Sequence, residues 1–351
     1  MSHEEPVLLA RRGRTARIIL NRPRALNALT HEMVRIIDAA LVEWEDDEGV
    51  RAVVLTGAGE RGLCAGGDIR AIYEDARAGG GGSEAFWRDE YRLNARIARY
   101  GKPYVAVMDG IVMGGGVGLA AHGSVRIVTE RSTVAMPETA IGLAPDVGGT
   151  YLLSRTPGEL GTHLALTGNA VGAADALLCG LADHAVPADL LPELLAALDD
   201  AGDADVREVV GRYARPAPEG RLAGDREWID TCYAADSVEE IVDRLYAQGN
   251  PAAKETAETI LTRSPTALKA TLAGLRAARE LSTLEQVLDR EYRASCAVLN
   301  VPDLLEGIRA RVIDKDRNPH WSPAELAGVT DADVARFAAV PPGGDLGLGS
   351  S

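Results

Sequence analysis

Short apolar runs alternate with helical patterns through the first half of the chain. Each run is followed by a polar residue or a glycine, which is typical of strands bounded by turns. After the first run, apolar residues from Met33 to Trp44 recur at helical spacing behind Thr30, a favourable N-cap. The glycine run Gly79–Ser83 predicts a flexible loop tip before a helix near Glu84–Tyr100. Strands that alternate with helices predict an α/β fold. The expected strands are Arg14–Leu20, Ala52–Thr56, Tyr104–Met108 and Val125–Thr129.

The pattern changes near Pro187, beyond which strand signals become rare and helical patterns dominate. We therefore expect an α/β core over residues 6–190 that carries the functional site, and a helical region over residues 191–340. The tail, Pro341–Ser351, is rich in Gly, Pro and Ser and is expected to be disordered. The expected helices of the second region are Leu190–Asp200, Val238–Gln248, Pro251–Arg263, Thr266–Glu280, Leu284–Leu299 and Pro302–Ile313.

Composition and charge narrow the class of protein. The chain has 351 residues and a net charge of −15, which argues against nucleic acid, because neutralising phosphates requires clustered Lys and Arg. The four cysteines show no CxxC spacing, so they predict reduced thiols rather than a zinc site or a disulfide framework. The N-terminal residues lack an apolar run of signal-peptide length, and no later stretch predicts a membrane span. We expect a cytoplasmic protein with no metal, nucleic-acid or membrane partner.

One apolar segment, Met136–Gly149, contains two carboxylates. Glu138 and Asp146 lie among apolar residues, Gly and Pro, and a charged carboxylate is costly to bury without a partner. This setting favours the wall of a functional cavity. Two simpler interpretations remain open: Glu138 as the cap of a turn before Thr139, and Asp146 as the cap of a helix that contains Tyr151.

The segment Gly57-Ala58-Gly59-Glu60-Arg61-Gly62 follows an expected strand and fits the pattern G-x-G-x-x-G. That pattern binds a dinucleotide only when a helix begins inside it. Here the chain continues into Gly66-Gly67-Asp68, which is a poor helix sequence. A glycine turn that leaves a strand is therefore the favoured interpretation, and binding of NAD or NADP is not expected.

Two other glycine segments, Cys64–Ile69 and Met113–Gly118, each place adjacent glycines beside an expected helix start. Glycine lets the backbone approach a ligand closely, and the free N–H groups of a first helical turn stabilise negative charge. Two such amides directed at one point form an oxyanion hole. For either segment alone, tight helix packing through small residues is the alternative. Neither segment is followed by Lys-Ser or Lys-Thr, so a P-loop is excluded.

In order and spacing, these motifs resemble the enoyl-CoA hydratase/isomerase (crotonase) superfamily. The segments that carry this resemblance are Asn21-Arg22-Pro23, Ala25–Leu29, Cys64–Ile69 and Gly114–Gly116. Within the superfamily, the chain is most similar to the 3-hydroxyisobutyryl-CoA hydrolase branch, over roughly residues 6–325. The segments similar to that branch are Arg88–Tyr91, Met113–Leu119, Met136–Gly149, Glu306–Ala310 and Asp314–Pro319.

The resemblance implies a fold and also a departure from the general mechanism. The superfamily fold is a ClpP/crotonase-like spiral of ββα units, here followed by a helical C-terminal region. Hydratases of the superfamily use two glutamates as acid and base, and these correspond to Gly118 and Glu138. Glycine cannot transfer a proton, whereas the hydrolase branch shares this glycine and has an added aspartate, matched by Asp146. Hydrolysis of a thioester is therefore the implied reaction.

The implied substrate is a short 3-hydroxyacyl-CoA, most closely 3-hydroxyisobutyryl-CoA, which is converted to 3-hydroxyisobutyrate and CoA in valine catabolism. The N–H groups of Gly67 and Gly115 would hold the oxyanion, and Glu138 would attack the carbonyl or activate water. Asp146 would position the 3-hydroxyl group and the water, or assist proton transfer to the departing thiolate. The other expected substrate contacts are Glu90, Leu26, Ala65, Gly66 and Asp68.

Simpler interpretations of two of these residues stay open: taken alone, Glu90 is a solvated helix residue and Asp68 fixes a local turn. No cofactor is implied, because CoA is part of the substrate. The superfamily commonly forms trimers or hexamers, so a homo-oligomer and a monomer are both considered. The alternative functions are an enoyl-CoA hydratase or isomerase and a non-enzymatic acyl-CoA binding module.

Overall fold

The computed structural model describes residues 5–349, which form two compact units that alternate along the chain. The division expected at residue 190 does not coincide with this arrangement, because two segments from the first half of the chain pack with the C-terminal helices. Within residues 5–349, no helix has both the length and the apolar character needed to cross a bilayer. Unit 1 comprises residues 5–67, 92–135 and 171–220, and unit 2 comprises residues 68–91, 136–170 and 221–349.

Unit 1 contains a mainly parallel sheet with six strands. In spatial order these are β1 (Val7–Arg12), β2 (Thr15–Leu20), β3 (Ala52–Gly57), β5 (Tyr104–Met108), β7 (Val125–Val128) and β9 (His184–Ala185). β1 and β2 form an antiparallel pair, and every later pair of neighbours is parallel. β5 is buried at every position, as is typical of a central parallel strand. Such uninterrupted apolar runs are the reason why the sequence pattern predicts these strands.

A smaller parallel sheet in unit 1 contains β4 (Gly62–Cys64), β6 (Ile111–Met113) and β8 (Thr133–Ala135). Along the chain, β3 precedes β4, β5 precedes β6 and β7 precedes β8. Each successive pair therefore adds one strand to each sheet, which is the spiral repeat expected from the resemblance. The predicted α/β fold is confirmed. The strands of the small sheet are too short to produce a periodic pattern, so the sequence does not predict them.

The core of unit 1 forms where two helices cover the large sheet. Every second residue of β5 and β7 contributes to it, including Val105, Val107, Val125 and Ile127. α8 (Leu191–Asp199) and α9 (Val206–Tyr213) supply the residues packed against them. The remaining helices of unit 1 are η1 (Pro23–Ala25), α1 (His31–Glu45), α4 (Gly115–Ala120), α7 (Ala173–Leu178) and η3 (Ala188–Leu190).

Two local predictions in unit 1 agree with the structure. The Thr30 side chain caps α1 by accepting a hydrogen bond from the Met33 N–H group at 3.3 Å. The G-x-G-x-x-G segment connects β3 directly to β4, whose first residue is Gly62, so no helix begins inside it. The geometry of this segment is therefore that of a turn between two strands.

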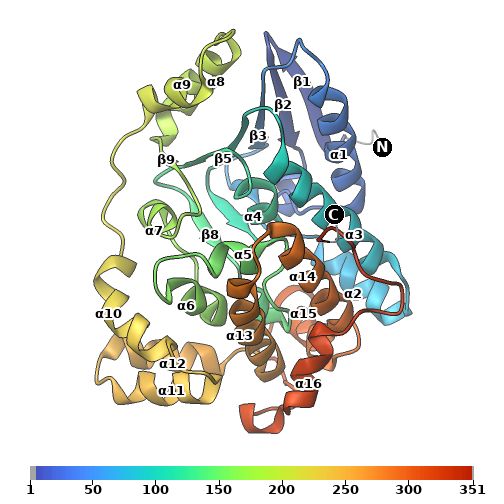
Figure 1. Cartoon of the computed structure of the whole chain (residues 1–351), viewed down its shortest axis with the longest axis vertical. Coiled ribbons are helices and arrows are strands. Elements are labelled where there is room, and N and C mark those ends of the chain that lie inside the picture. The colour runs from blue at the N-terminus through green and yellow to red at the C-terminus, as the bar shows by residue number, and fades with distance from the viewer. Residues whose placement is uncertain (1–4, 350–351) are drawn as a thin grey trace. The chain divides into compact units, whose positions relative to one another are not determined.

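Unit 2 is helical in its described residues. The helices predicted after residue 220 are present close to their expected bounds, and α13 (Pro265–Glu280) and α14 (Leu284–Val298) lie side by side (Figure 1). α3 (Gly82–Arg99) begins in unit 2 and continues into unit 1 from residue 92. The others are α2 (Ile69–Ala78), η2 (Glu138–Ile141), α5 (Gly149–Leu153), α6 (Leu160–Thr167), α10 (Leu222–Tyr233), α11 (Val238–Ala247), α12 (Pro251–Leu261), α15 (Pro302–Ile308), η4 (Arg309–Ile313), η5 (Leu326–Gly328), α16 (Asp331–Ala335) and η6 (Arg336–Ala338).

The loop tip expected at Gly79–Ser83 is shorter than predicted. Gly82 and Ser83 belong to α3, and the Asp75 carboxylate accepts hydrogen bonds from both of their N–H groups, at 3.1 and 2.7 Å. An acidic side chain from α2 thus satisfies amides that a helix start leaves without acceptors.

The C-terminal tail also differs from the expected disorder. Its described part, residues 341–349, follows α14, and the Asp289 carboxylate accepts hydrogen bonds from the N–H groups of Leu348 (2.9 Å) and Gly349 (2.8 Å). Asp345 forms an ion pair with Arg293 of the same helix. Polar side chains of α14 therefore hold a segment whose composition predicts disorder. Residues 350–351 lie outside the described residues.

The contact between α4 and β4 gives a stability prediction. A Cβ atom at Gly116 would lie 2.5 Å from the Cys64 carbonyl oxygen, which is fixed in the sheet backbone. We expect Gly116→Ala to lower the free energy of unfolding by about 1–3 kcal/mol in urea denaturation. Gly211→Ala in α9 is the matched control, because a Cβ atom there meets open space and alanine favours the helix by up to about 1 kcal/mol. Equal effects of the two substitutions would contradict this packing.

Candidate active site

In unit 1, the two glycine segments meet at one end of the small sheet. β4 and β6 are parallel neighbours, and the segments Ala65–Gly67 and Gly114–Gly116 follow their carboxyl ends, which lie at the same edge. Gly66 has a φ of +108°, and a Cβ atom there would lie 3.3 Å from the Met113 carbonyl oxygen and 3.8 Å from the Gly115 nitrogen. Glycine is therefore required at position 66 by its backbone conformation and by the close approach of the second segment.

The first turn of α4 contains a backbone N–H group that has no acceptor within the helix. The N–H groups of Val117 and Gly118 donate to the Gly114 carbonyl oxygen, at 2.8 and 3.1 Å. Gly115 is buried and is the first residue of α4, a position whose N–H group has no acceptor within the helix. This is one of the two donors that the sequence predicts for an oxyanion hole. The other, Gly67, directly follows Gly66 in the neighbouring segment.

Three of the residues expected to contact the substrate also come together in unit 1. The Ala65 N–H group donates to the Leu26 carbonyl oxygen at 3.0 Å, and the Leu29 N–H group donates to the Gly66 carbonyl oxygen at 2.8 Å. These bonds join the segment after η1 to the first glycine segment. The structure therefore places Leu26 beside Ala65 and Gly66, which lie far from it in the sequence.

In unit 2, the three candidate carboxylates are buried. Glu90 is 2% exposed, Glu138 is 5% exposed and Asp146 is 6% exposed. Burial excludes the interpretation of Glu90 as a solvated helix residue. Asp146 is not the cap of the helix that contains Tyr151, because α5 has Gly148 as its N-cap with no side-chain bond. Glu138 Oε2 has no hydrogen-bond partner among the described residues, and the interpretation of Glu138 as a turn cap stays open.

A directional chain of hydrogen bonds reaches Asp146. The Tyr91 hydroxyl group donates to Asp146 Oδ2 at 2.7 Å and lies 2.7 Å from the Ser295 hydroxyl oxygen. Because the single hydroxyl proton of Tyr91 goes to the carboxylate, Ser295 donates to Tyr91. All three side chains are buried, so this chain stabilises negative charge on Asp146 in a setting that excludes water.

Burial and mutual repulsion control the protonation of the carboxylates. Burial, followed by the charges of Asp146 and Glu138, raises the pKa of Glu90 well above its ordinary value. Burial and the charge of Asp146 raise the pKa of Glu138 in the same direction. Burial raises the pKa of Asp146 to about 6, and the hydrogen bond from Tyr91 opposes this rise. The three carboxyl groups therefore differ in how strongly their charged forms are supported, and such differences allow neighbouring carboxyl groups to take different parts in acid–base chemistry.

Glu291 is a buried carboxylate that the sequence analysis does not identify. It extends from α14 and accepts hydrogen bonds from the N–H groups of Gly148 (2.6 Å) and Thr150 (2.8 Å), and from the Thr150 hydroxyl group. Burial raises its pKa to about 8 although these three donors oppose the rise. Glu291 thus ties the start of α5, next to Asp146, to α14.

A sequence signal for Glu291 and Ser295 exists in α14. Buried positions recur along this helix at intervals of three and four residues, from Leu284 to Val298, and Glu291 and Ser295 occupy two of them. A carboxylate and a hydroxyl group at apolar positions indicate a partner inside the protein. Tyr91 lies beside Glu90 in a segment that carries the resemblance, but its bond to Asp146 is visible only in the structure.

The structure divides the predicted site residues into two groups. Leu26, Ala65, Gly66, Gly67 and Gly115 belong to unit 1, whereas Glu90, Glu138, Asp146 and Asp68 belong to unit 2. Asp68 precedes α2 and forms no side-chain cap. Its carbonyl oxygen accepts a hydrogen bond from the Ala71 N–H group at 3.0 Å, which fits a role in a local turn.

Among residues 5–349, no group of three or more His, Cys, Asp and Glu side chains is arranged to hold a metal ion.

Comparison with known proteins identifies the family. The family model described as enoyl-CoA hydratase/isomerase matches residues 15–338, so the chain belongs to this family. The predicted superfamily and fold are thereby confirmed.

Relatives with assigned names are similar over most of the chain. The mitochondrial 3-hydroxyisobutyryl-CoA hydrolase of Danio rerio is 44% identical over 93% of this chain and 88% of its own length. The protein of the same name from Rattus norvegicus is 45% identical over 94% of this chain and 88% of its own length. The names of these relatives do not support the cytoplasmic location predicted from the sequence, which stays a prediction.

Two solved structures have the same fold and carry other names. A carnitinyl-CoA dehydratase from Mycobacterium thermoresistibile is 52% identical, with a TM-score of 0.94 over 97% of this chain and 98% of that chain. An enoyl-CoA hydratase from Rhodobacter sphaeroides is 44% identical, with a TM-score of 0.90 over the same shares of the two chains. The names of similar proteins thus indicate two reactions: hydrolysis of a thioester, and the addition of water to a carbon–carbon double bond or its reversal.

The raised pKa of Glu138 predicts a pH-dependent effect on stability. Between the ordinary value of 4.5 and the raised value, the folded state binds more protons than the unfolded state, so stability falls as pH rises. Gln cannot ionise, and we expect Glu138→Gln to gain stability over the natural chain by up to about 1.4 kcal/mol for each pH unit above 4.5. Urea denaturation from pH 4 to pH 8 measures this difference. The exposed Glu255→Gln in α12 should show no such trend.

The hydrogen bond from Tyr91 predicts the direction in which the pKa of Asp146 moves. Tyr91→Phe removes a donor to the ionised carboxylate, so the pKa of Asp146 should rise above about 6, by about 1 to 2. Carbon-13 NMR titration of labelled aspartate carboxyl groups measures it, with Asp146→Asn to assign the signal. Tyr100→Phe, which removes a buried hydroxyl bonded to the Leu41 carbonyl oxygen, should leave this pKa unchanged. An unmoved pKa in Tyr91→Phe would disprove the role of the bond.

Proposed function

We propose that this chain hydrolyses a short 3-hydroxyacyl-CoA thioester, with 3-hydroxyisobutyryl-CoA as its principal substrate. The observation that carries this proposal is the pair of buried carboxylates Glu138 and Asp146, combined with glycine at position 118. The names of curated relatives across most of the chain support the same substrate.

Gly118 argues against the two-glutamate hydration mechanism. It is buried in α4, and its N–H group donates to the Gly114 carbonyl oxygen. No side chain at this position can move a proton to or from a substrate. Hydration of a double bond needs a base that takes a proton from water and an acid that gives a proton to carbon. Thioester hydrolysis instead needs an activated nucleophile and an oxyanion site.

The raised pKa values of Glu138 and Asp146 suit proton exchange during hydrolysis. One ionised carboxylate can accept a proton from water, and a protonated neighbour can return a proton to the departing thiolate. In the proposed reaction, Glu138 attacks the thioester carbonyl carbon or activates the water that does so, and Asp146 positions the 3-hydroxyl group and the water. Glu90 contacts the substrate, and its Oε1 atom has no protein partner among the described residues.

The backbone amides of Gly67 and Gly115 are the proposed oxyanion donors. Each donor of this kind contributes about 3 kcal/mol to lowering the barrier. The carbon–sulfur bond breaks, the acyl carbon gains a hydroxyl group from water, and CoA leaves as the thiol. The proposal includes no separate cofactor, because water is the only co-reactant and CoA is part of the substrate.

An enoyl-CoA hydratase or a related dehydratase is the second candidate, because two solved structures with the same fold carry such names. The two reactions give different products. Hydrolysis of 3-hydroxyisobutyryl-CoA releases a free thiol, whereas hydration of crotonyl-CoA removes the absorbance of the enoyl thioester without releasing thiol. Efficient hydration with no thiol release from any short acyl-CoA would disprove the proposed hydrolysis.

The role of Glu138 predicts the effect of its substitution on turnover. We expect Glu138→Gln to lower the rate of thiol release from 3-hydroxyisobutyryl-CoA by about 10²- to 10⁴-fold, because an amide neither ionises nor exchanges a proton. A thiol-reactive dye measures release, and the background is low because all four cysteines are buried. Glu255→Gln serves as the control and should retain the natural rate. An acyl-CoA binding module without catalysis would show the same negligible rate in all three proteins.

A further inference from the structure

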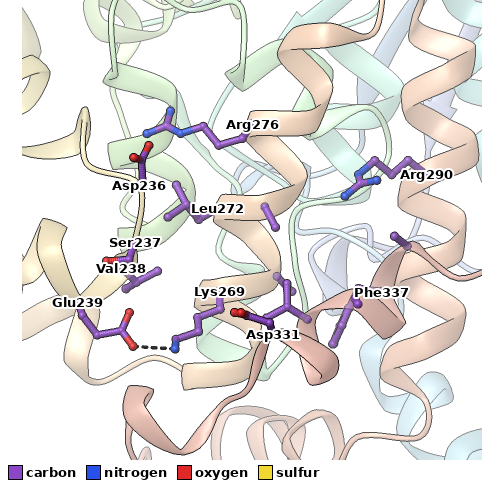
Figure 2. Close-up of a pocket in the computed structure, with 15 residues that line it drawn as sticks. Asp236, Ser237, Val238, Glu239, Lys269, Leu272, Arg276, Arg290, Asp331 and Phe337 are labelled. Atoms are coloured by element: carbon purple, nitrogen blue, oxygen red, sulfur yellow. Dashed lines mark ion pairs between the residues drawn. The ribbon is translucent and has the colours of Figure 1, made fainter.

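A second candidate site lies within unit 2, in a cavity of about 430 Å³ (Figure 2). Its walls come from the start of α11, from α13 and α14, and from the region of α16 and η6. None of the residues in the carboxylate cluster lines this cavity. The volume lies within the range of natural small-molecule sites.

The cavity has an apolar wall. Leu272 of α13 is 4% exposed and Phe337 of η6 is 7% exposed, and both line the cavity with Val238 and Val334. This wall suits the hydrocarbon part of a ligand, because burying apolar surface is favourable. A ligand that is charged throughout would leave the wall unused.

Two of the three cationic side chains around the cavity are already neutralised. Lys269 forms an ion pair with Glu239 at 2.6 Å, which Figure 2 marks by a dashed line. Arg276 forms an ion pair with Glu159 at 2.9 Å and also donates to the Tyr233 carbonyl oxygen. The charges of Lys269 and Arg276 are therefore neutralised by carboxylates of the protein itself.

Arg290 of α14 differs from these two side chains. It is half-buried, and it forms no hydrogen bond or ion pair with any other residue described by the structure. Burial, together with the like charge of Arg293, lowers its pKa, whereas Arg293 itself is paired with Asp345. In Figure 2 the guanidinium end of Arg290 extends toward the middle of the cavity. A partly desolvated guanidinium group without an anion is expected to bind one.

We propose that this cavity binds a small organic monocarboxylate. The two carboxylate oxygens accept hydrogen bonds from the guanidinium group of Arg290, and the apolar body of the ligand lies against Leu272 and Phe337. Exposed Asp236 and Asp331 also line the cavity, and their negative charges disfavour anions with several charges, such as phosphates and nucleotides. This site is independent of the proposed thioester hydrolysis.

Isothermal titration of the full-length chain with benzoate and isovalerate, with inorganic phosphate for comparison, tests this proposal. We expect saturable binding of the two carboxylates and weaker binding of phosphate. Arg290→Gln should weaken carboxylate binding about 10- to 100-fold, the effect of losing hydrogen bonds to a charged group. Arg290→Lys keeps the charge but loses the two-pronged geometry, so its affinity should lie between those of the natural chain and Arg290→Gln. Arg226→Gln, on the exposed face of α10, is the control and should bind as the natural chain does.

A second substitution is expected to change the carboxylate affinity in the opposite direction. Asp331→Asn removes a negative charge from the cavity lining and should strengthen carboxylate binding, by a factor that falls as salt is added. Thermal unfolding of each variant shows whether it is folded, and Arg290→Lys and Asp331→Asn keep the test valid if Arg290→Gln does not fold. Absence of saturable binding by the natural chain up to about 10 mM carboxylate would overturn the proposal. So would an affinity that is unchanged in Arg290→Gln and Asp331→Asn, or phosphate binding as tight as carboxylate binding.

Discussion

The structure of unit 2 depends on keeping several carboxyl groups out of water. An isolated carboxylate in a protein interior is strongly destabilising, and a buried group avoids this cost by holding a proton or by accepting hydrogen bonds. Both solutions are present side by side. Glu90 and Glu138 each have an oxygen with no partner among residues 5–349 and have raised pKa values, whereas Asp146 is supported by Tyr91 and, through it, by Ser295. The hydrogen bond from Tyr91 thus favours the charged form of Asp146, whereas burial disfavours the charged forms of Glu90 and Glu138.

α14 is the element that makes this arrangement possible. Its inward face supplies Ser295 to the hydrogen-bond chain and Glu291 to the start of α5, where Val147 and Gly148 both have positive φ angles. A backbone turn of this kind is strained at a valine, and the two amides bound by Glu291 fix it. The same helix anchors the described part of the tail through Asp289 and Arg293. Stability and the geometry around Asp146 are therefore linked through one helix.

In the family fold, the backbone builds one part of the site and the side chains select the reaction. In unit 1, the parallel pairing of β4 and β6 brings two glycine segments to one sheet edge by backbone geometry alone. Such an arrangement serves any reaction that places negative charge on a thioester oxygen. The choice of reaction rests on side chains, and a glycine at position 118 removes a proton carrier without disturbing α4. A shared fold does not fix the reaction, and two solved structures with closely similar backbones carry the names of other enzymes.

The sequence by itself determined the elements whose signals are local. Apolar runs predicted β3, β5 and β7, helical spacing predicted α11 to α14, and Thr30 predicted the start of α1, because each depends on neighbouring residues. Motif resemblance also identified Glu90, Glu138 and Asp146. Only the tertiary structure decided that these carboxylates are buried and that Tyr91 donates to Asp146. It also decided that two side chains of α14 have different surroundings: Glu291 binds the turn before α5, and Arg290 lines a cavity. Burial and protonation depend on residues that are distant in the chain, and short strands such as β4 are stable only through their partners in the sheet.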